Sequence, residues 1–462
     1  MIKNEKMKKI FVVLIFGLLN THINAQCWQS ISVGNSHTIA IRTDGTLWAW
    51  GKNYYGELGD STNIDKNFPI QIGSDNNWQF IASGEDYNVA IKTDGTLWTW
   101  GRNIFGQLGD GTNIDKNFPI QIGTETNWES ISAGNHTIAL KTDGTLWTWG
   151  YNNEGQLGDG TFINENTPIQ IGTSNNWQSI AAGQEYSLAI KTDGTLWAWG
   201  INDEGELGDG TIIHKNIPTL IGTDLNWQTI STHNVHSVAI KTDGTLWAWG
   251  RNDDGALGDG TNIDKHVPTQ IGVFTNWQSI AAGHQTIAIK TDGTLWAWGF
   301  NNDGELGDGT TVSKNIPTQI GVSTNWQSIA AEGTHTVAIK TDETLWAWGK
   351  NYWGALGDGT NIDKHNPTFI SCYSLGTDEL NFKDIININP NPVTDYLTIN
   401  LLKKVNDASV EIYNSIGGII IKETISNTFS KTISTKNFPS GIYFVKLQMQ
   451  DGNVVVKKII KE

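Results

Sequence analysis

The sequence predicts an all-β protein, in which a seven-bladed β-propeller of four-stranded repeats is followed by a small β-sandwich. One pattern, close to W-Q-S-I-A-A-G and then L-W-A-W-G and G-x-L-G-D-G-T, occurs seven times in a chain of 462 residues. The tryptophan pair of L-W-x-W-G recurs every 49 or 50 residues, a period typical of propeller blades and solenoids. The repeat ends near Ile370, and no tryptophan follows it.

Each repeat reads as four short antiparallel strands. In the first repeat the expected strands are the runs 31–33, 38–41, 46–50 and 69–72. Asp44-Gly45 separates the second run from the third and favours a type I′ hairpin turn, which needs positive φ. A glycine-rich corner precedes the last run, whose Pro69 suits the start of an edge strand. Only the seventh repeat changes the hairpin glycine, to Glu343.

The repeats contain 21 of the 22 tryptophans, three in each repeat. Trp48 and Trp50 are two positions apart, so they point to one face of their strand, while Leu47 and Ala49 point to the other. Large side chains on one face and small ones on the other suit the stacking of blades. We therefore expect the tryptophans to form the core, with hydrogen-bonded indole N–H groups, rather than a ladder that stacks on a ligand.

The segment from Trp28 to Ile370 resembles the regulator-of-chromosome-condensation repeat family. All seven copies carry L-W-x-W-G, N-x-x-G-x-L-G and the Gly-Thr or Ser-Thr that follows Asp. The resemblance implies a seven-bladed propeller that serves as a platform for protein interactions. The family's founder is a chromatin-bound exchange factor for a small GTPase, and a secreted bacterial member covers and inhibits β-lactamases. Since a fold does not fix a function, the site has to be argued from this chain's own residues.

Residues 1–25 are expected to be a secretory signal peptide. Lysines open the segment, residues 10–19 carry no charge, and Ala25 supplies a small residue at the cleavage point. The segment is too short to span a bilayer, and no other stretch of the chain predicts an integral membrane span. Lipidation of Cys27 is an alternative, but Gln26 stands where a small residue is expected before a lipidated cysteine.

Residues 385–462 are expected to form a separate domain. Asn-Pro-Asn-Pro at 389–392 introduces Tyr396–Ile399, and later strand-like runs follow a Gly-Gly turn. This tail resembles the C-terminal sorting domain of the type IX secretion system of Bacteroidota, a small β-sandwich. The resemblance implies the type IX machinery as a partner and a final location that is secreted or at the outer cell surface. Residues 26–372 then form the propeller, and residues 373–384 form the linker.

The chain has only two cysteines, Cys27 and Cys372, one at each end of the predicted propeller. Every other pair of neighbouring blades is joined by a short peptide at this place. We predict a Cys27–Cys372 disulfide that replaces the missing peptide between blades seven and one, in an oxidising compartment that permits it. The alternative is that both are unrelated small apolar residues.

The formal net charge of −16 limits the partners. The acidic excess lies in the propeller, because residues 26–375 contain 17 Lys and Arg against 37 Asp and Glu, and the tail is close to neutral. Such a surface repels phosphate backbones, so nucleic acid is not expected as a partner. Cationic partners, or partners held by uncharged contacts, fit better.

The sequence predicts no enzyme, no cofactor and no metal site. One position after the first strand of each repeat often holds a histidine. Its seven copies are spread around the ring, so we expect this position to be structural, with a histidine that bonds its own turn. The seven residues are His37, Tyr87, His136, Tyr186, His236, Gln285 and His335. We expect no residues that differ from the repeat to form a cluster of acids, bases or metal ligands. A calcium loop at Asn301, Asp303 and Asp308 is the alternative to a plain turn, although the carboxylate spacing differs by about one residue from a calcium loop.

The most informative positions are two variable residues in the corner of each repeat. Blades seven, one and two, which are neighbours in a closed ring, place apolar and aromatic residues there: Tyr352, Trp353, Tyr54, Tyr55, Ile104 and Phe105. The other four blades place Asn, Asp or Glu there. Exposed aromatic clusters often mark contact surfaces, so these six residues are the predicted binding site. The alternative is that they cover the ring junction or have drifted without a role.

These observations predict a secreted or cell-surface propeller that acts as a non-catalytic protein-binding module. The partner would be an extracellular or cell-surface protein. The alternative function is a carbohydrate-binding surface protein or adhesin, in which the aromatic rings stack on a polysaccharide. A propeller enzyme such as a lactonase or lyase lacks a candidate acid, base or metal cluster.

Overall fold

The computed structural model describes residues 27–371, 386–390, 392–405, 408–414, 418–426, 428–448 and 454–462. The predicted signal peptide, the predicted linker and Cys372 therefore lie outside the described residues. Contacts divide the chain into two units between residues 373 and 374, and each unit is described by itself. The described residues form strands, turns and loops and no helix, which confirms the all-β prediction.

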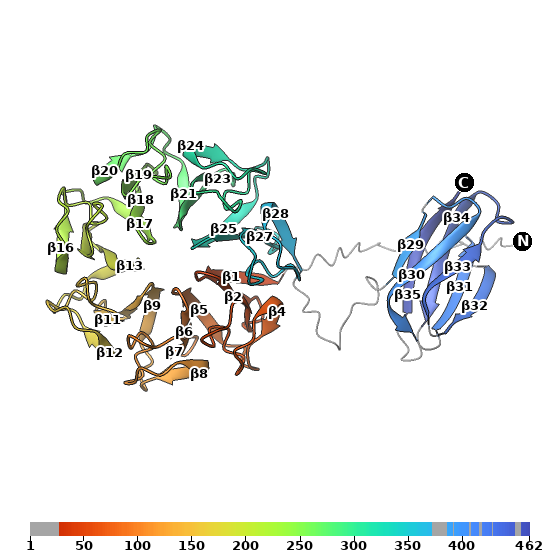
Figure 1. The fold of residues 1–462 in the computed structure, drawn as a ribbon, viewed down its shortest axis with the longest axis horizontal. Coiled ribbons are helices and arrows are strands. Elements are labelled where there is room, and N and C mark those ends of the chain that lie inside the picture. Colours follow the sequence, from red (N-terminus) through yellow and green to blue (C-terminus); the bar gives the residue numbers. More distant parts are fainter. Residues whose placement is uncertain are drawn as a thin grey trace, which may run out of the picture. The chain divides into compact units, whose positions relative to one another are not determined.

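The first unit is a ring of seven antiparallel sheets, each with four strands in sequence order (Figure 1). Blades one to three comprise β1 (Trp28–Val33), β2 (His37–Arg42), β3 (Leu47–Gly51) and β4 (Lys66–Gln71); β5 (Trp78–Ser83), β6 (Tyr87–Lys92), β7 (Leu97–Gly101) and β8 (Lys116–Ile122); and β9 (Trp128–Ala133), β10 (His136–Lys141), β11 (Leu146–Gly150) and β12 (Glu165–Gln170). Blades four and five comprise β13 (Trp177–Ala182), β14 (Tyr186–Lys191), β15 (Leu196–Gly200) and β16 (Lys215–Ile221); and β17 (Trp227–Thr232), β18 (His236–Lys241), β19 (Leu246–Gly250) and β20 (Lys265–Gln270). Blades six and seven comprise β21 (Trp277–Ala282), β22 (Gln285–Lys290), β23 (Leu295–Gly299) and β24 (Lys314–Gln319); and β25 (Trp326–Glu332), β26 (His335–Lys340), β27 (Leu345–Gly349) and β28 (Lys364–Ile370).

The hairpin between the second and third strands differs from the predicted type I′ turn. In blade one, Arg42 N–H donates to Thr46 O at 3.0 Å, so the loop has three residues rather than two. Only Gly45 has a positive φ, of 80°, as in a type I turn followed by a left-handed glycine. The Asp44 side chain closes the loop by accepting hydrogen bonds from the backbone N–H and the hydroxyl of Thr46. Aspartate thus serves as a side-chain acceptor here and does not need positive φ.

The exception at Glu343 follows from the way the blades are joined. A Cβ on Gly45 would lie 2.1 Å from Asn76 O, in the peptide that leads to the next blade, and the five later hairpin glycines face the same clash. No covalent linker leads from blade seven to blade one, and there Glu343 occupies the slot at φ 61°. Its carbonyl accepts a 3.3 Å bond from Trp28 N–H, as Gly45 O does from Trp78 N–H. Hydrogen bonds therefore close the ring where the peptide is missing.

Cys27 lies at this junction between blades seven and one. Its carbonyl accepts a 2.9 Å hydrogen bond from Thr43 N–H, and its side chain packs against the core cluster that contains Trp28 and Leu345. This position fits the predicted disulfide, but Cys372 lies outside the described residues. The disulfide therefore remains a prediction.

The tryptophans form the core between blades, as predicted. Trp28, Trp48 and Trp50 pack together against Leu345 and Ala347 of blade seven. The opposite face of blade one, with Leu47 and Ala49, packs against the tryptophans of blade two. Each sheet thus presents a bulky face to one neighbour and a small-residue face to the other.

The prediction that the indole N–H groups are hydrogen-bonded is confirmed for two of the three tryptophans in each repeat. The first tryptophan of each W-x-W pair donates to the threonine two residues before it, as Trp48 does to Thr46 at 2.8 Å. The second donates to the corner loop of the preceding blade, as Trp100 does to Glu57 O at 2.9 Å. The prediction was wrong for the leading tryptophans, whose indole nitrogens have no hydrogen-bond partner in the described structure: Trp28, Trp78, Trp128, Trp177, Trp227, Trp277 and Trp326. Each of these rings instead meets the other two edge-on or tilted, which leaves no acceptor at its nitrogen.

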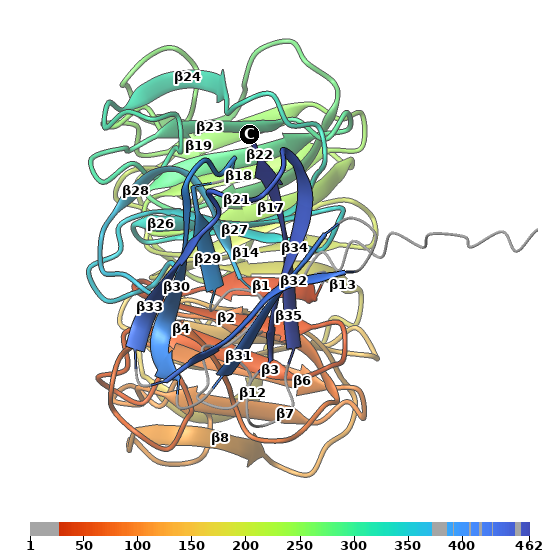
Figure 2. The ribbon, with the colours of Figure 1, turned by 90° about the vertical axis from the view of Figure 1, so that its right-hand side faces the viewer.

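The second unit has two antiparallel sheets around one core. One sheet has the order β29-β30-β33 and the other β32-β31-β34-β35, and Figure 2 shows these two groups of strands. Their bounds are β29 (Ile386–Asn389), β30 (Tyr396–Val405), β31 (Ala408–Asn414), β32 (Ile419–Ile425), β33 (Thr428–Ser434), β34 (Gly441–Gln448) and β35 (Val454–Lys461). Leu397 and Ile433 from the first sheet share the core with Val410 and Val445 from the second. This arrangement is a small β-sandwich, as predicted. In the part of the chain that the structure describes, no helix has the length and apolar character needed to cross a membrane.

Candidate functional site

The six residues predicted to bind a partner lie in equivalent corner loops, between β3 and β4, β7 and β8, and β27 and β28. We call them the aromatic arc: Tyr54, Tyr55, Ile104, Phe105, Tyr352 and Trp353. The first residue of each pair is strongly exposed, with 70% of Tyr54, 44% of Ile104 and 64% of Tyr352 accessible to solvent. These three side chains are the most exposed part of the arc.

The second residue of each pair is more covered. Tyr55 and Phe105 are half-buried, and Trp353 is 39% exposed. The ring centroids of Tyr54 and Tyr55 are 4.8 Å apart and those of Tyr352 and Trp353 are 4.7 Å apart, both with edge-on rings. In blades one and seven the second ring thus packs edge-on against the exposed first ring.

A cation joins the arc across blades one and two. The Arg102 guanidinium lies 4.8 Å from the centroid of the Tyr55 ring and 6.0 Å from that of Phe105. Asp86 holds it through a 3.3 Å ion pair, and the same carboxylate binds Lys52 at 2.7 Å. Cation–π attraction therefore orients the supporting rings while the charges are balanced locally.

Asparagine side chains tie the three loops of the arc to one another. Asn67 of blade one donates to Asn361 of blade seven at 3.1 Å, and Asn117 of blade two donates to Asn63 of blade one at 3.2 Å. Asn63 also donates to the carbonyl of Tyr54, at 2.8 Å, so the tie continues to the arc itself. The three loops that carry the arc are therefore neighbours joined by hydrogen bonds.

The equivalent loops of blades three to six form an acidic sector. His214 lies between Glu154, at 3.1 Å, and Asp203, at 2.9 Å. Burial raises the pKa of Glu185, and Glu154, Glu85 and Asp203 raise it further. The face therefore has an apolar part next to a negatively charged part.

The slot expected to hold turn-bonding histidines has a different structural role. Its residues bond the next blade, and together they close a ring of seven contacts around the propeller: His37–Asn88, Tyr87–Thr137, His136–Ser187, Tyr186–Ser237, His236–Thr286, Gln285–Thr336 and His335–Thr38. The last contact, His335 Nε2 to Thr38 Oγ1 at 3.0 Å, joins blade seven to blade one. The prediction of a structural role was correct, but the bond to the residue's own turn was wrong. Sequence spacing gave no information on a partner about 50 residues away.

Burial keeps these histidines neutral. It lowers the pKa of His136 to about 3 and that of His236 to about 4, against an unperturbed 6.5. Between about pH 6.5 and pH 5 both sites therefore stay largely unprotonated in the folded protein, whereas the same histidines take up protons in the unfolded chain. Stability from these sites is fully present above pH 6.5 and is lost progressively as the pH falls from 6.5 toward the folded pKa values of about 3 for His136 and about 4 for His236.

We expect His136→Gln to reduce the loss of stability on acidification. The folded propeller excludes the proton from His136, so the wild type loses about 2 kcal/mol at this site between pH 7 and pH 5. Glutamine does not titrate, and it fits the slot, because Gln285 donates to Thr336 at 2.9 Å after a turn of the same length. The measurement is the free energy of unfolding at several pH values, followed by tryptophan fluorescence. Gln285→His is the reciprocal control and should steepen the acid loss; parallel curves for all three proteins would contradict the assignment.

The corner considered for calcium is held together by protein contacts. Asn301 Oδ1 accepts from Leu306 N–H at 2.9 Å, and Asn301 Nδ2 donates to Asp308 at 3.4 Å. Asp308 also pairs with Lys314 at 3.6 Å. Among the described residues there is no group of three or more His, Cys, Asp or Glu that could hold a metal ion. The contacts support a self-contained turn and give the calcium hypothesis no support.

Seven exposed apolar residues were not singled out from the sequence. Each corner loop carries one, with between 60% and 67% of its surface exposed: Ile64, Ile114, Ile163, Ile213, Ile263, Val312 and Ile362. Their recurrence in every repeat is the signal that could have found them. Because all blades share them, they do not mark one sector of the ring.

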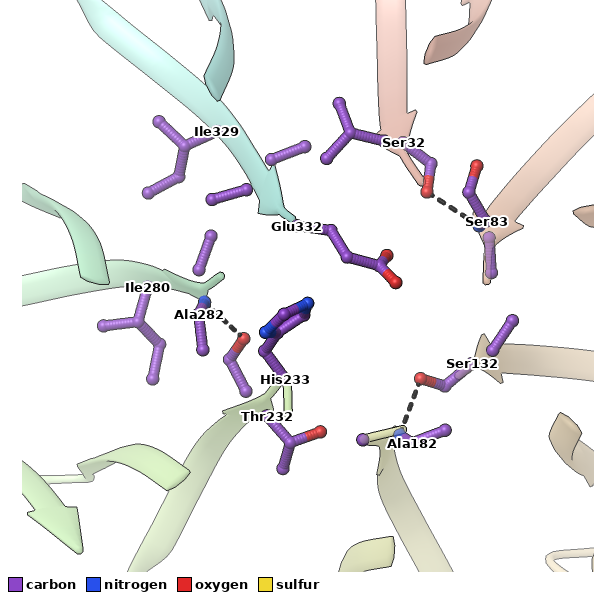
Figure 3. Close-up of a pocket in the computed structure, with 18 of the residues that line it drawn as sticks. Ser32, Ser83, Ser132, Ala182, Thr232, His233, Ile280, Ala282, Ile329 and Glu332 are labelled. Atoms are coloured by element: carbon purple, nitrogen blue, oxygen red, sulfur yellow. Dashed lines mark hydrogen bonds between the residues drawn. The ribbon is translucent and has the colours of Figure 1, made fainter. Parts of the chain in front are cut away.

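Two further residues were missed, and they depart from the repeat. The glycine that ends W-Q-S-I-A-A-G is His233 in blade five and Glu332 in blade seven. Figure 3 shows both side chains directed into the central channel, among Ser32, Ser132 and Thr232. The expectation that nothing departs from the repeat to form a cluster was therefore wrong. Comparing the seven copies at this glycine would have found both residues.

Comparisons with known proteins agree with this architecture. Residues 122–389 match the model of the RCC1-like domain, and residues 44–91 and 94–140 match the regulator of chromosome condensation (RCC1) repeat. The crystal structure of Prp20p from Saccharomyces cerevisiae is similar, with a TM-score of 0.63, 23% identity, and coverage of 79% of this chain and 90% of that one. At this identity the likeness shows the fold.

Two curated relatives match over short segments. An X-linked retinitis pigmentosa GTPase regulator homolog of Caenorhabditis elegans is 40% identical over 55 residues, which are 10% of this chain and 4% of the relative. An endo-acting ulvan lyase of Formosa agariphila is 30% identical over 92 residues, which are 20% of this chain and 18% of the lyase. The chain thus spans less than a fifth of the length of either relative.

The tail matches a separate family model. Residues 387–462 correspond to the secretion system C-terminal sorting domain. This domain marks the protein for type IX export to the cell surface or the extracellular space. The RCC1-like domain model covers more than half of the chain, including blades three to seven of the ring, so the chain belongs to the RCC1-like domain family.

Proposed function

We propose that this exported propeller is a non-catalytic protein-binding module and that the aromatic arc is its contact surface. The observation that carries the proposal is the exposure of Tyr54, Ile104 and Tyr352 on three linked loops. Aromatic side chains in a contiguous exposed patch contribute strongly to protein interfaces when a partner removes them from water. The repeat does not require them, because four of the seven blades carry polar residues there.

The partner's chemistry follows from the two sectors of the face. An apolar, partly aromatic surface would cover the arc, and basic residues beside it would meet the acidic loops of blades three to six. Charge complementarity of this kind mainly speeds association and selects among partners. Prp20p, similar in fold, is described by its binding to Gsp1p and histones, which are proteins.

We also propose, for a physical reason, that the protein is not an enzyme. The buried histidines form hydrogen bonds between blades, and burial keeps them neutral. They hold neighbouring blades together. The partial similarity to an ulvan lyase covers only 18% of that enzyme.

A carbohydrate is the second candidate partner. The edge-on pairs leave the outer rings of Tyr54 and Tyr352 exposed, and exposed rings of this kind can stack on sugars. The two candidates differ in how the bound material responds to digestion.

We expect a double variant, Tyr54→Ser with Tyr352→Ser, to weaken partner binding by at least tenfold without unfolding the propeller. The full chain is immobilised, exposed to envelope and culture material of its own cells, and the affinity for the isolated retained component is then measured. Asn153→Ser with Asn302→Ser is the matched control, because these residues occupy the equivalent exposed positions in blades three and six. A retained component destroyed by protease supports the protein-binding function, and one destroyed only by glycosidases supports the adhesin. Equal affinity of the two double variants would remove the arc as the contact surface.

A further inference from the structure

The corner loops of blades three and four carry an apolar residue where the other blades carry a polar one. It is Phe162 in blade three and Ile212 in blade four, directly before the isoleucine or valine that every corner loop exposes. The other five blades have Asn63, Asn113, Asn262, Thr311 and Asn361 at this position. We define the apolar patch as five side chains of these two blades, each with between 53% and 67% of its surface exposed: Phe162, Ile163, Ile212, Ile213 and Ile217.

The structure of the loop gives no reason for the two apolar side chains. Asn63, at the same position in blade one, donates a hydrogen bond to Tyr54 O at 2.8 Å, and the asparagines of blades two, five and seven make the equivalent bond. Phe162 and Ile212 cannot donate such a bond, and they leave more than half of their surface in water. The stability of the loop therefore favours asparagine, and the two apolar residues require an explanation outside the folded chain.

The two loops of the apolar patch are neighbours joined by hydrogen bonds. Gly160 N–H donates to Asn216 O at 2.8 Å, and Asn216 Nδ2 donates to Gly160 O, also at 2.8 Å. A Cβ on Gly160 would lie 3.8 Å from Ile217 Cγ2, so this isoleucine of blade four lies beside the backbone of the blade-three loop. Phe162 follows two residues after Gly160. One segment of a partner can therefore contact side chains from both loops.

The charges beside the apolar patch are negative and lack the usual cation. In the other six blades the corner aspartate pairs with the lysine that begins the outer strand, as Asp110 does with Lys116 at 2.9 Å. Blade three begins its outer strand with Glu165 instead. Among the described residues no ion pair reaches its corner aspartate, Asp159. A lysine or arginine from a partner would supply the missing positive charge.

We propose that the apolar patch binds a basic, amphipathic segment of another protein, with a lysine or arginine of that segment beside Asp159 and Glu165. Burial of the apolar side chains supplies affinity, and the opposite charges select the partner. Four of the five side chains are aliphatic and offer no flat ring on which a sugar could stack. A second copy of this chain, or an anionic lipid surface, would bring like charges together. The apolar patch lies on other loops than the aromatic arc, so the proposal does not rest on the arc.

The proposal is tested with a display library of random peptides of about 12 residues, selected on the full chain. The enriched peptides are expected to combine lysine or arginine with large apolar residues. Phe162→Asn with Ile212→Asn, which restores the asparagine of other blades, should weaken their binding by at least tenfold in fluorescence anisotropy. Glu165→Lys, which restores the lysine of the other six blades, should weaken binding similarly and reduce its dependence on salt.

Val312→Asn is the matched control, because it removes an exposed apolar side chain from the corner loop of blade six. It should leave the affinity of the peptides unchanged, as should Tyr54→Ser in the arc, and thermal melting checks that every variant folds. If no basic and apolar peptide is enriched, or if none of those enriched loses affinity for the double variant, the proposal is overturned.

Two other occupants of the apolar patch would give different results. Self-association of the wild type that the double variant abolishes would identify a second copy of the chain. Co-sedimentation with vesicles of phosphatidylethanolamine and phosphatidylglycerol, abolished by the same variant, would identify a membrane surface. Either result would overturn the proposal of a basic protein segment.

Discussion

Replacing Gly134 with alanine should destabilise the propeller by about 3 kcal/mol or more, because the new methyl group has no space between blades three and four. Its Cβ would lie 1.8 Å from the carbonyl oxygen and 2.6 Å from the carbonyl carbon of Gly183. Both atoms are backbone, so relief requires the blades to separate. Separation would also lengthen the 3.2 Å hydrogen bond from Asn135 N–H to Gln184 O. Denaturant unfolding followed by tryptophan fluorescence measures the propeller alone, since no tryptophan lies after residue 353.

Gly283→Ala is the matched control in blade six. The nearest atom to its Cβ would be Gln285 Oε1, at 3.2 Å, and the nearest backbone atoms would be 3.3 Å away. The side chain of Gln285 can give way, so the expected change in the free energy of unfolding is within about 1 kcal/mol. Equal losses for both alanine variants would mean that the blades adjust freely, and the steric account of this glycine would be wrong.

The close contacts at these glycines help to explain which features of the candidate sites could be predicted from the sequence. The fold followed from periodicity alone, because a strand–turn pattern with Trp48 and Trp50 on one face has few ways to bury that face. The arc was placed correctly on neighbouring loops, because register within a repeat transfers from blade to blade. His233 and Glu332 were missed because their significance depends on how little room the glycine slot leaves. The space at this position depends on how neighbouring blades pack in the ring, and the sequence of one repeat does not show it.

Contacts between blades account for the other errors. The slot of His136 was correctly judged structural, but its partner Ser187 belongs to the next blade. The leading tryptophans lack the expected acceptors because two other rings surround each of them. Sequence patterns define a single blade well, whereas hydrogen bonds between blades depend on the angle at which two sheets meet.

Trp199→Ala should cost about 3 to 5 kcal/mol, the range for a fully buried tryptophan that leaves a cavity. Trp199 has no exposed surface, and its indole N–H donates to Gln156 O of the preceding blade at 2.8 Å. Gly158 packs against the ring near its nitrogen, since a Cβ there would be 2.7 Å from the indole nitrogen. Alanine therefore removes the anchor of the corner loop of blade three as well as the packing. Unfolding free energies give the total, and hydrogen exchange at residues 155–158 reports the loop.

Trp197→Ala, two residues earlier on β15, separates packing from anchoring. This ring is half-buried, donates within its own hairpin to Thr195 at 2.9 Å, and lies under Lys191 Nζ, 4.2 Å from its centroid. Its removal takes away area and a cation–π contact but no bond between blades, so we expect a loss of about 2 kcal/mol and unchanged exchange at residues 155–158. If Trp197→Ala instead exposed that loop as much as Trp199→Ala does, the hydrogen bond to Gln156 would not be the link. The cohesion of the ring would then rest on the stacking of whole sheets, and the anchor of each corner loop would be secondary.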